Sequence, residues 1–122
     1  MCSILLSINP QHVDNILKGQ KSYEFRKTLC KQKVDKILIY STSPVMKVVG
    51  EAEVETVLKG EPDYIWTLTR KEAGIGKKFY DRYYEHSKLA VAFKLCNVVE
   101  YSKPKELKDY GINNAPQSFC YI

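Results

Sequence analysis

Two long runs of alternating apolar and polar residues limit what this chain can fold into. The first extends from Met46 to Leu58 and the second from Leu89 to Val99. Because successive side chains of a strand point to opposite faces, both runs predict strands longer than the usual five or six residues. Gly50 interrupts the first run, and a glycine inside a strand indicates a bulge or sharp bend of the kind found at barrel corners.

Shorter elements surround these two strands. Further strands are predicted at Ser3–Ile8, Lys21–Lys27, Lys36–Ser41 and Gln117–Ile122. Helices are predicted from the Asn9-Pro10 cap to Gly19, from Pro62 to the Gly74–Gly76 break, and from Lys77 to His86, and Pro104 is expected to begin a loop. This order lacks the regular βαβ repetition of a doubly wound fold. It favours one α+β domain over residues 1–122, a small mixed β-barrel with helices at its ends.

Composition excludes several classes of protein. A chain of 122 residues with 44% hydrophobic and 27% charged side chains is typical of a folded globule. No apolar run is long enough to span a bilayer, and the N-terminus lacks the basic region of a signal peptide. We therefore expect no membrane partner. The four cysteines, Cys2, Cys30, Cys96 and Cys120, are scattered, which is typical of reduced thiols in a cytoplasmic protein.

Known metal and cofactor motifs are missing from the sequence. It contains no phosphate-binding P-loop, no GxSxG elbow, no HExxH and no CxxC pair. The two histidines, His12 and His86, fall on different predicted helices, where surface or capping positions are expected. The sequence thus predicts no metal and no cofactor.

The net charge of +5 lies in one short window. Between Lys18 and Lys36 there are seven basic and two acidic residues, whereas the other 103 residues carry 12 of each. One interpretation is a solvated lysine-rich edge that prevents unwanted strand pairing. The other is an electrostatic footprint for nucleic acid or another polyanion.

The most informative segment of that window runs from Gly19 to Arg26. Strand alternation places Tyr23 and Phe25 on one face and Glu24 and Arg26 on the other. Glu24 and Arg26 could pair with each other, or Arg26 could bind a phosphate while Glu24 accepts from a base or ribose hydroxyl. Strict alternation puts Lys21 on the aromatic face, so its use in the same site requires a twist at the start of the strand.

This segment resembles the signature of the ASCH domain, a branch of the PUA-like superfamily. The pattern G-x-K-x-x-E-x-R is matched at Gly19, Lys21, Glu24 and Arg26. The segments Leu6–Pro10, Ile39–Pro44, Val49–Glu51 and Pro116–Phe119 are also similar to the family, in the same order. The resemblance implies a five- or six-stranded barrel with helices around its openings. It also implies a cleft lined by the signature beneath the first helix.

The resemblance implies RNA or another nucleic acid as the partner, or a nucleotide-like small molecule. The binding residues expected for it are Lys18, Lys21, Glu24, Arg26, Lys27, Lys31, Lys33 and Ser41. The alternative is a small hydrolase of acetylcytidine or of single-stranded RNA, with Lys21 and Glu24 as catalytic residues. Amidohydrolases of the family carry a threonine nucleophile where this chain has Glu24, which favours binding over deacetylation.

Two further features have open interpretations. The aromatic cluster Phe79, Tyr80, Tyr83 and Tyr84 is either a core face of its helix or a stacking surface for unpaired bases. Cys30 lies between lysines that could depress its pKa, but no histidine is near in sequence to act as its base.

Overall fold

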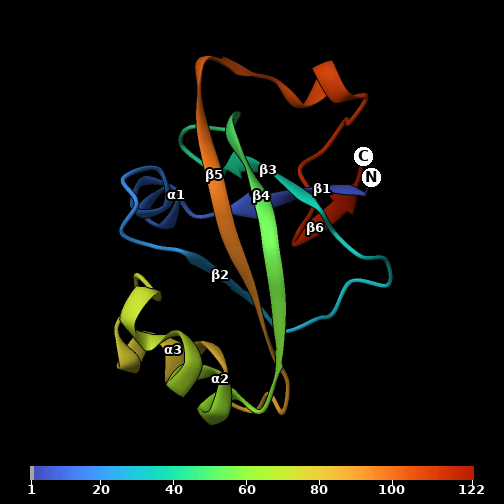
Figure 1. Ribbon diagram of the computed structural model, residues 1–122. Coiled ribbons are helices and arrows are strands. Elements are labelled where there is room, and N and C mark those ends of the chain that lie inside the picture. Colours follow the sequence, from blue (N-terminus) through green and yellow to red (C-terminus); the bar gives the residue numbers. More distant parts are fainter. Residues whose placement is uncertain (1) are drawn as a thin grey trace.

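The computed structural model describes residues 2–122 as a curled mixed sheet with helices at its margins (Figure 1). Its six strands are β1 (Ser3–Ile8), β2 (Tyr23–Arg26), β3 (Lys36–Ser41), β4 (Lys47–Gly60), β5 (Ala90–Lys105) and β6 (Phe119–Tyr121). They lie in the order β2-β5-β4-β3-β1-β6, in which β1 and β3 are parallel and the other pairs antiparallel. The predicted α+β class and the barrel-like sheet are thereby confirmed.

The helices begin where the sequence indicates, and α2 and α3 end earlier than predicted. They are α1 (Pro10–Leu17), α2 (Pro62–Thr69) and α3 (Lys77–Tyr83), with 3₁₀ turns at Arg70–Glu72 and Leu107–Tyr110. The Asn9 side chain caps α1 by accepting from the backbone N–H of Gln11 at 2.9 Å. Gly19 follows α1 with φ +79°, a left-handed conformation that suits glycine. The last helix ends three residues before the predicted His86.

The antiparallel pair of β4 and β5, called the hairpin below although α2 and α3 connect the two strands, forms the long axis of the molecule (Figure 1). The expectation that Pro104 begins a loop is wrong, because β5 continues to Lys105. At that end β5 pairs with β4 alone, so a proline without an N–H can be accommodated on the unpaired side. The predicted irregularity at Gly50 is confirmed by a register shift there. A Cβ at Gly50 would meet the carbonyl oxygen of Val99.

The sheet curls into a half-barrel whose two edges are not joined by a strand ladder. One edge is β2, and the other is formed by β6 beside β1. The interior is filled by aliphatic and aromatic side chains from β1, α1, β3 and β5, including Ile4, Leu6, Ile39 and Phe93. A second apolar cluster fixes α2 and α3 to β2 and the start of β5. The open side between β2 and β1 is called the seam below.

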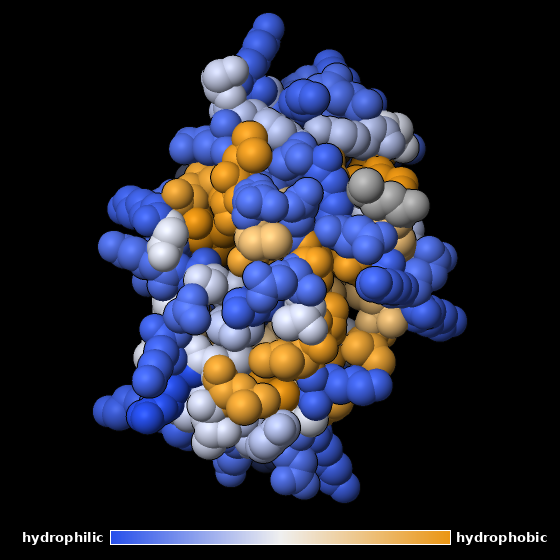
Figure 2. Space-filling model, viewed as in Figure 1, coloured by the Kyte–Doolittle hydropathy of each residue, from blue (hydrophilic) through white to orange (hydrophobic). Residues whose placement is uncertain are grey.

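The outer surface on the hairpin side is mostly hydrophilic, with separate apolar patches between the polar side chains (Figure 2). Scattered apolar patches of this kind are normal on folded proteins. None of the helices in residues 2–122 has the length and apolar character needed to cross a bilayer.

Candidate functional site

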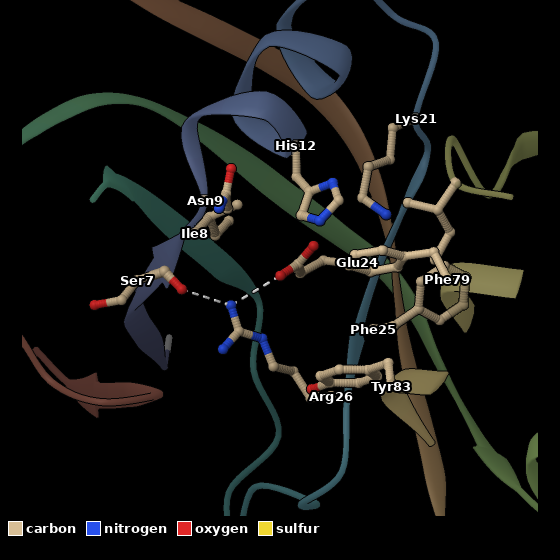
Figure 3. Close-up of a pocket in the computed structure, with 11 residues that line it drawn as sticks. Ser7, Ile8, Asn9, His12, Lys21, Glu24, Phe25, Arg26, Phe79 and Tyr83 are labelled. Carbon is tan, nitrogen blue, oxygen red and sulfur yellow. Dashed lines mark hydrogen bonds and ion pairs between the residues drawn. The ribbon is translucent and has the colours of Figure 1, made fainter. Parts of the chain in front are cut away.

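A pocket of about 140 Å³ lies at the seam, where the half-barrel is open (Figure 3). Its walls come from the end of β1, the first turn of α1, the signature segment, the loop before α3, and α3 itself. The lining residues are Ser7, Ile8, Asn9, His12, Lys21, Glu24, Phe25, Arg26, Ile75, Phe79 and Tyr83. Three of the four signature residues therefore face one cavity, together with side chains from distant parts of the chain.

Arg26 connects the two edges of the seam. Its Nη2 donates to the carbonyl oxygen of Ser7 on β1 and to Oε2 of Glu24, both at 2.8 Å. Its Nη1 donates to Oγ of Ser118, just before β6, at 3.4 Å. The predicted pairing of Glu24 with Arg26 is thus present, and both side chains are largely buried. The buried Nε of Arg26 has no hydrogen-bond partner within residues 2–122, so one of its donors is unsatisfied.

Lys21 is a buried cation in the wall of the pocket. It is only 3% exposed, its Nζ donates to the carbonyl of Ala73 at 3.0 Å, and the ammonium lies 4.8 Å from the ring centre of Phe25. Burial lowers the pKa of Lys21, and the positive charge of Arg26 acts in the same direction. The strand begins only at Tyr23, so the alternation of side chains within the strand does not determine the direction of Lys21. Its side chain lines the same pocket as that of Glu24.

The loop before α3 holds Lys21 in place. Gly74 has φ +70°, and a Cβ there would approach Cγ of Lys21 to 2.6 Å. The backbone N–H of Ser22 also donates to the carbonyl of Glu72 at 2.9 Å. Gly74 is therefore needed both for the turn and for the close approach of the loop to the lysine.

His12 belongs to the pocket, contrary to the surface or capping position expected from the sequence. Its ring meets that of Phe79 edge-on, with centroids 5.2 Å apart. Burial lowers the pKa of His12, as does the charge of Lys21, and this favours the neutral imidazole. Its buried Nδ1 lacks a hydrogen-bond partner among residues 2–122. The sequence feature that could have indicated this position is that His12 precedes Val13, at the margin of the apolar stripe of α1.

The aromatic cluster of α3 divides between core and pocket. Tyr80 and Tyr84 are buried, and burial raises the pKa of both hydroxyls. Phe79 is 51% exposed and lines the pocket together with half-buried Tyr83, whose ring lies 4.7 Å below the ammonium of Lys27. The core interpretation is therefore confirmed for Tyr80 and Tyr84, whereas base stacking on Phe79 and Tyr83 stays a prediction.

The other predicted binding residues lie outside the pocket wall. Lys18 is exposed at the end of α1, and Ser41 is buried at the end of β3, paired with Ile8. Lys31 and Lys33 are exposed in the loop after β2 and line a separate hollow of about 220 Å³.

The cysteines of residues 2–122 form no disulfide, and the acidic side chains in that range form no metal-ligand cluster. Burial raises the pKa of the Cys30 thiol, so the depression that its lysine neighbours could cause is not found. All four cysteines are free thiols. Within residues 2–122, no three His, Cys, Asp or Glu side chains are grouped as metal ligands.

The open mixed barrel, with its cleft between the first helix and the strand that follows it, defines a PUA-like protein. Within that superfamily the chain belongs to the ASCH domain family. It is 32% identical over 122 residues to an ASCH domain-containing ribonuclease of Zymomonas mobilis and covers 82% of that protein. The crystal structure of ASCH from Zymomonas mobilis has a TM-score of 0.89 and 29% identity, covering 98% of this chain and 87% of that one.

Two other comparisons describe the same region of sequence. Residues 1–113 match the model of a domain of unknown function (DUF365). The chain is also 36% identical over 121 residues to the large ribosomal subunit protein uL22 of Ureaplasma parvum, and 33% identical to the ATP synthase subunit alpha of that organism. It spans 39% of the first protein and 15% of the second, so it corresponds to only a part of each.

Proposed function

We propose that this chain binds single-stranded RNA and places one nucleotide in the seam pocket. The observation that carries the proposal is the combination of buried Lys21 and largely buried Arg26 with aromatic walls at Phe79 and Tyr83. With one carboxylate, Glu24, in the same pocket, the charged groups leave one positive charge uncompensated. A nucleotide supplies both a negative charge and a ring that stacks on aromatic side chains.

Particular atoms suit particular parts of a nucleotide. The guanidinium of Arg26, whose Nη1 makes only a 3.4 Å contact with Ser118, and the remaining protons of the Lys21 ammonium are donors for phosphate oxygens. The side chain of Tyr83, under the ammonium of Lys27, offers a face for a base. The exposed Lys18, Lys31 and Lys33 then contribute salt-sensitive attraction from outside the pocket, and buried Ser41 supports the wall at Ile8.

The test measures binding of a fluorescent eight-nucleotide RNA at several salt concentrations. Lys21→Met should weaken binding at least tenfold, because a donor inside the pocket is removed, whereas Lys103→Met, at an exposed position on β5, should change it less than twofold. Lys31→Met with Lys33→Met should make the salt dependence shallower, by about 0.7 in log–log slope for each phosphate that is no longer neutralised. Undetectable binding at low salt, or equal effects of Lys21→Met and Lys103→Met, contradicts the proposal.

A second candidate function, cleavage of the bound RNA, is favoured by His12. A neutral imidazole beside a buried ammonium and a guanidinium provides a base, an acid and a stabiliser of phosphate charge. In the step we envisage, His12 removes the proton of the ribose 2′-hydroxyl and the 2′-oxygen attacks phosphorus. The 5′-oxygen then leaves with a proton from Lys21, which gives a 2′,3′-cyclic phosphate and a 5′-hydroxyl. The similar Zymomonas mobilis protein is named a ribonuclease.

Cleavage is tested with matched RNAs that carry a 2′-hydroxyl or a 2′-O-methyl group. Only the hydroxyl form should be cut, and His12→Ala should slow cutting about 100-fold or more. Equal cutting of both RNAs contradicts the proposed step. Deacetylation of acetylcytidine has weaker support, because Glu24 is held by Arg26 and the Ser7 hydroxyl already donates to the carbonyl of Pro116 at 2.7 Å.

A further inference from the structure

A second hollow of about 190 Å³ adjoins the seam pocket. His12, Ile75 and Phe79 line both cavities, so these three side chains form the partition between them. The contact of the His12 ring with the edge of Phe79 is part of that partition, and Figure 3 shows both rings beside the pocket. The seam pocket and this flanking hollow are therefore adjacent compartments of one recess.

The chemistry of the flanking hollow differs from that of the seam pocket. It has no Lys, Arg, Asp or Glu in its lining, whereas the seam pocket has three such residues. Its polar side chains, besides the shared His12, are the carboxamides of Gln11 and Asn15, which lie one turn apart on α1. A carboxamide offers a donor and an acceptor side by side, which matches the edge of a nucleobase better than a phosphate.

The partition has the character of a stacking platform. Phe79 leaves half of its surface exposed although it is a large apolar side chain. A base placed in the flanking hollow would cover part of that surface, and such stacking stabilises single-stranded nucleic acid without strict sequence preference. Gly76 also lines the hollow without a side chain, and a Cβ there would meet nothing within 4 Å.

From this arrangement we infer that the flanking hollow is a second nucleotide subsite. It takes the neutral base next to the nucleotide in the seam pocket, and Phe79 and His12 separate the two bases. The inference rests on the proposed function and deepens it, because it makes a dinucleotide the smallest ligand that occupies the whole site. Binding of the second base uses Gln11 and Asn15 for its edge and Phe79 for its face.

The experiment compares 2′-O-methyl adenylyl-adenosine with adenosine 3′- and 5′-monophosphates by calorimetry. The dinucleotide should bind about tenfold more tightly than either monophosphate, the gain expected from one stacked base. Gly76→Leu should fill the hollow and abolish that gain while leaving monophosphate affinity within about twofold. Gly76→Ser is the matched control and should retain the gain, since φ −78° accepts any residue and serine is a good helix cap. Asn15→Leu, of similar size, should also reduce the gain.

The experiment distinguishes a failure of the second subsite from a failure of the proposed function. If the dinucleotide gains nothing while an eight-nucleotide RNA still binds and depends on Lys21, the second subsite is wrong and the proposed function stands. If Gly76→Leu weakens the dinucleotide and the monophosphates equally, the hollow is no separate subsite. If none of these ligands binds, both the subsite and the proposed function are wrong.

Discussion

Burial in the seam pocket opposes protonation of His12. Because burial and Lys21 lower its pKa below the ordinary 6.5, the unfolded chain binds more protons than the folded one below that pH. The stability contributed by neutral His12 is complete above pH 6.5 and is lost as the pH falls through its folded pKa. We predict an unfolding free energy that decreases on acidification, by at most about 1.4 kcal/mol per pH unit for this proton.

Denaturant titrations between pH 7.5 and 5 would check this dependence. His12→Asn should remove it, whereas His86→Asn should not, because the His86 side chain is 90% exposed. Identical pH dependence in the His12→Asn variant and the unmodified chain would show that burial of His12 has no energetic effect.

Gly74 controls the position of Lys21. Gly74→Ala combines a left-handed backbone with a clash against the lysine side chain, so we expect a loss of about 2 kcal/mol or more. Gly76→Ser, two residues further in open space and at the helix cap, should change stability by less than about 0.5 kcal/mol. Thermal and denaturant unfolding measure both values. Equal losses in the two variants would contradict the role given to Gly74.

At the scale of elements, β2 is attached to the opposite edge of the sheet by a side chain. Arg26→Met removes the bridge to Ser7 and leaves the Glu24 carboxylate buried without its partner, which should cost about 3 kcal/mol. Adding Glu24→Gln should recover part of that loss. In a double-mutant cycle we expect a coupling of more than about 1 kcal/mol.

The exposed pair Lys77–Asp81 serves as the control for that cycle. Both of its side chains are 51% exposed, so its coupling should be about 0.5 kcal/mol or less. A Glu24–Arg26 coupling no larger than this value would mean that the bridge does not hold the seam together.

The positions of most strands and helices could be predicted from local sequence patterns, because side-chain alternation and helix caps depend on only a few neighbouring residues. Asn9-Pro10 and Gly19 enclose α1 as predicted, and the hairpin strands follow their alternation. The extension of β5 through Pro104 could not be read in the same way. It depends on which side of the strand has a neighbour, and only the tertiary arrangement decides that.

Local patterns also limit how many residues of the candidate site could be predicted from the sequence. Lys21, Glu24 and Arg26 lie within six residues, so their common cavity follows from the start of one strand. His12, Phe79 and Tyr83 come from helices that meet β2 only through long-range packing, and no local pattern links them to the signature.

At the scale of the whole molecule, the open side of the half-barrel brings these groups together. A fully closed barrel would pair β2 with its opposite edge through the backbone, whereas here Arg26 spans the gap and a pocket lies beside it. Some of the basic residues of the sequence window thus lie in the pocket, at Lys21 and Arg26, and others in the exposed loop, at Lys31 and Lys33.

The most direct test of the central claim, that RNA binds in the seam pocket, is an NMR titration of the ¹⁵N-labelled chain with a 2′-O-methyl eight-nucleotide RNA at low salt. We predict that the largest shift changes fall on amides of residues 7–12, 21–26 and 74–83, with smaller changes in the loop 29–34. Absence of shift changes, or changes concentrated on surfaces remote from the seam, would contradict the claim.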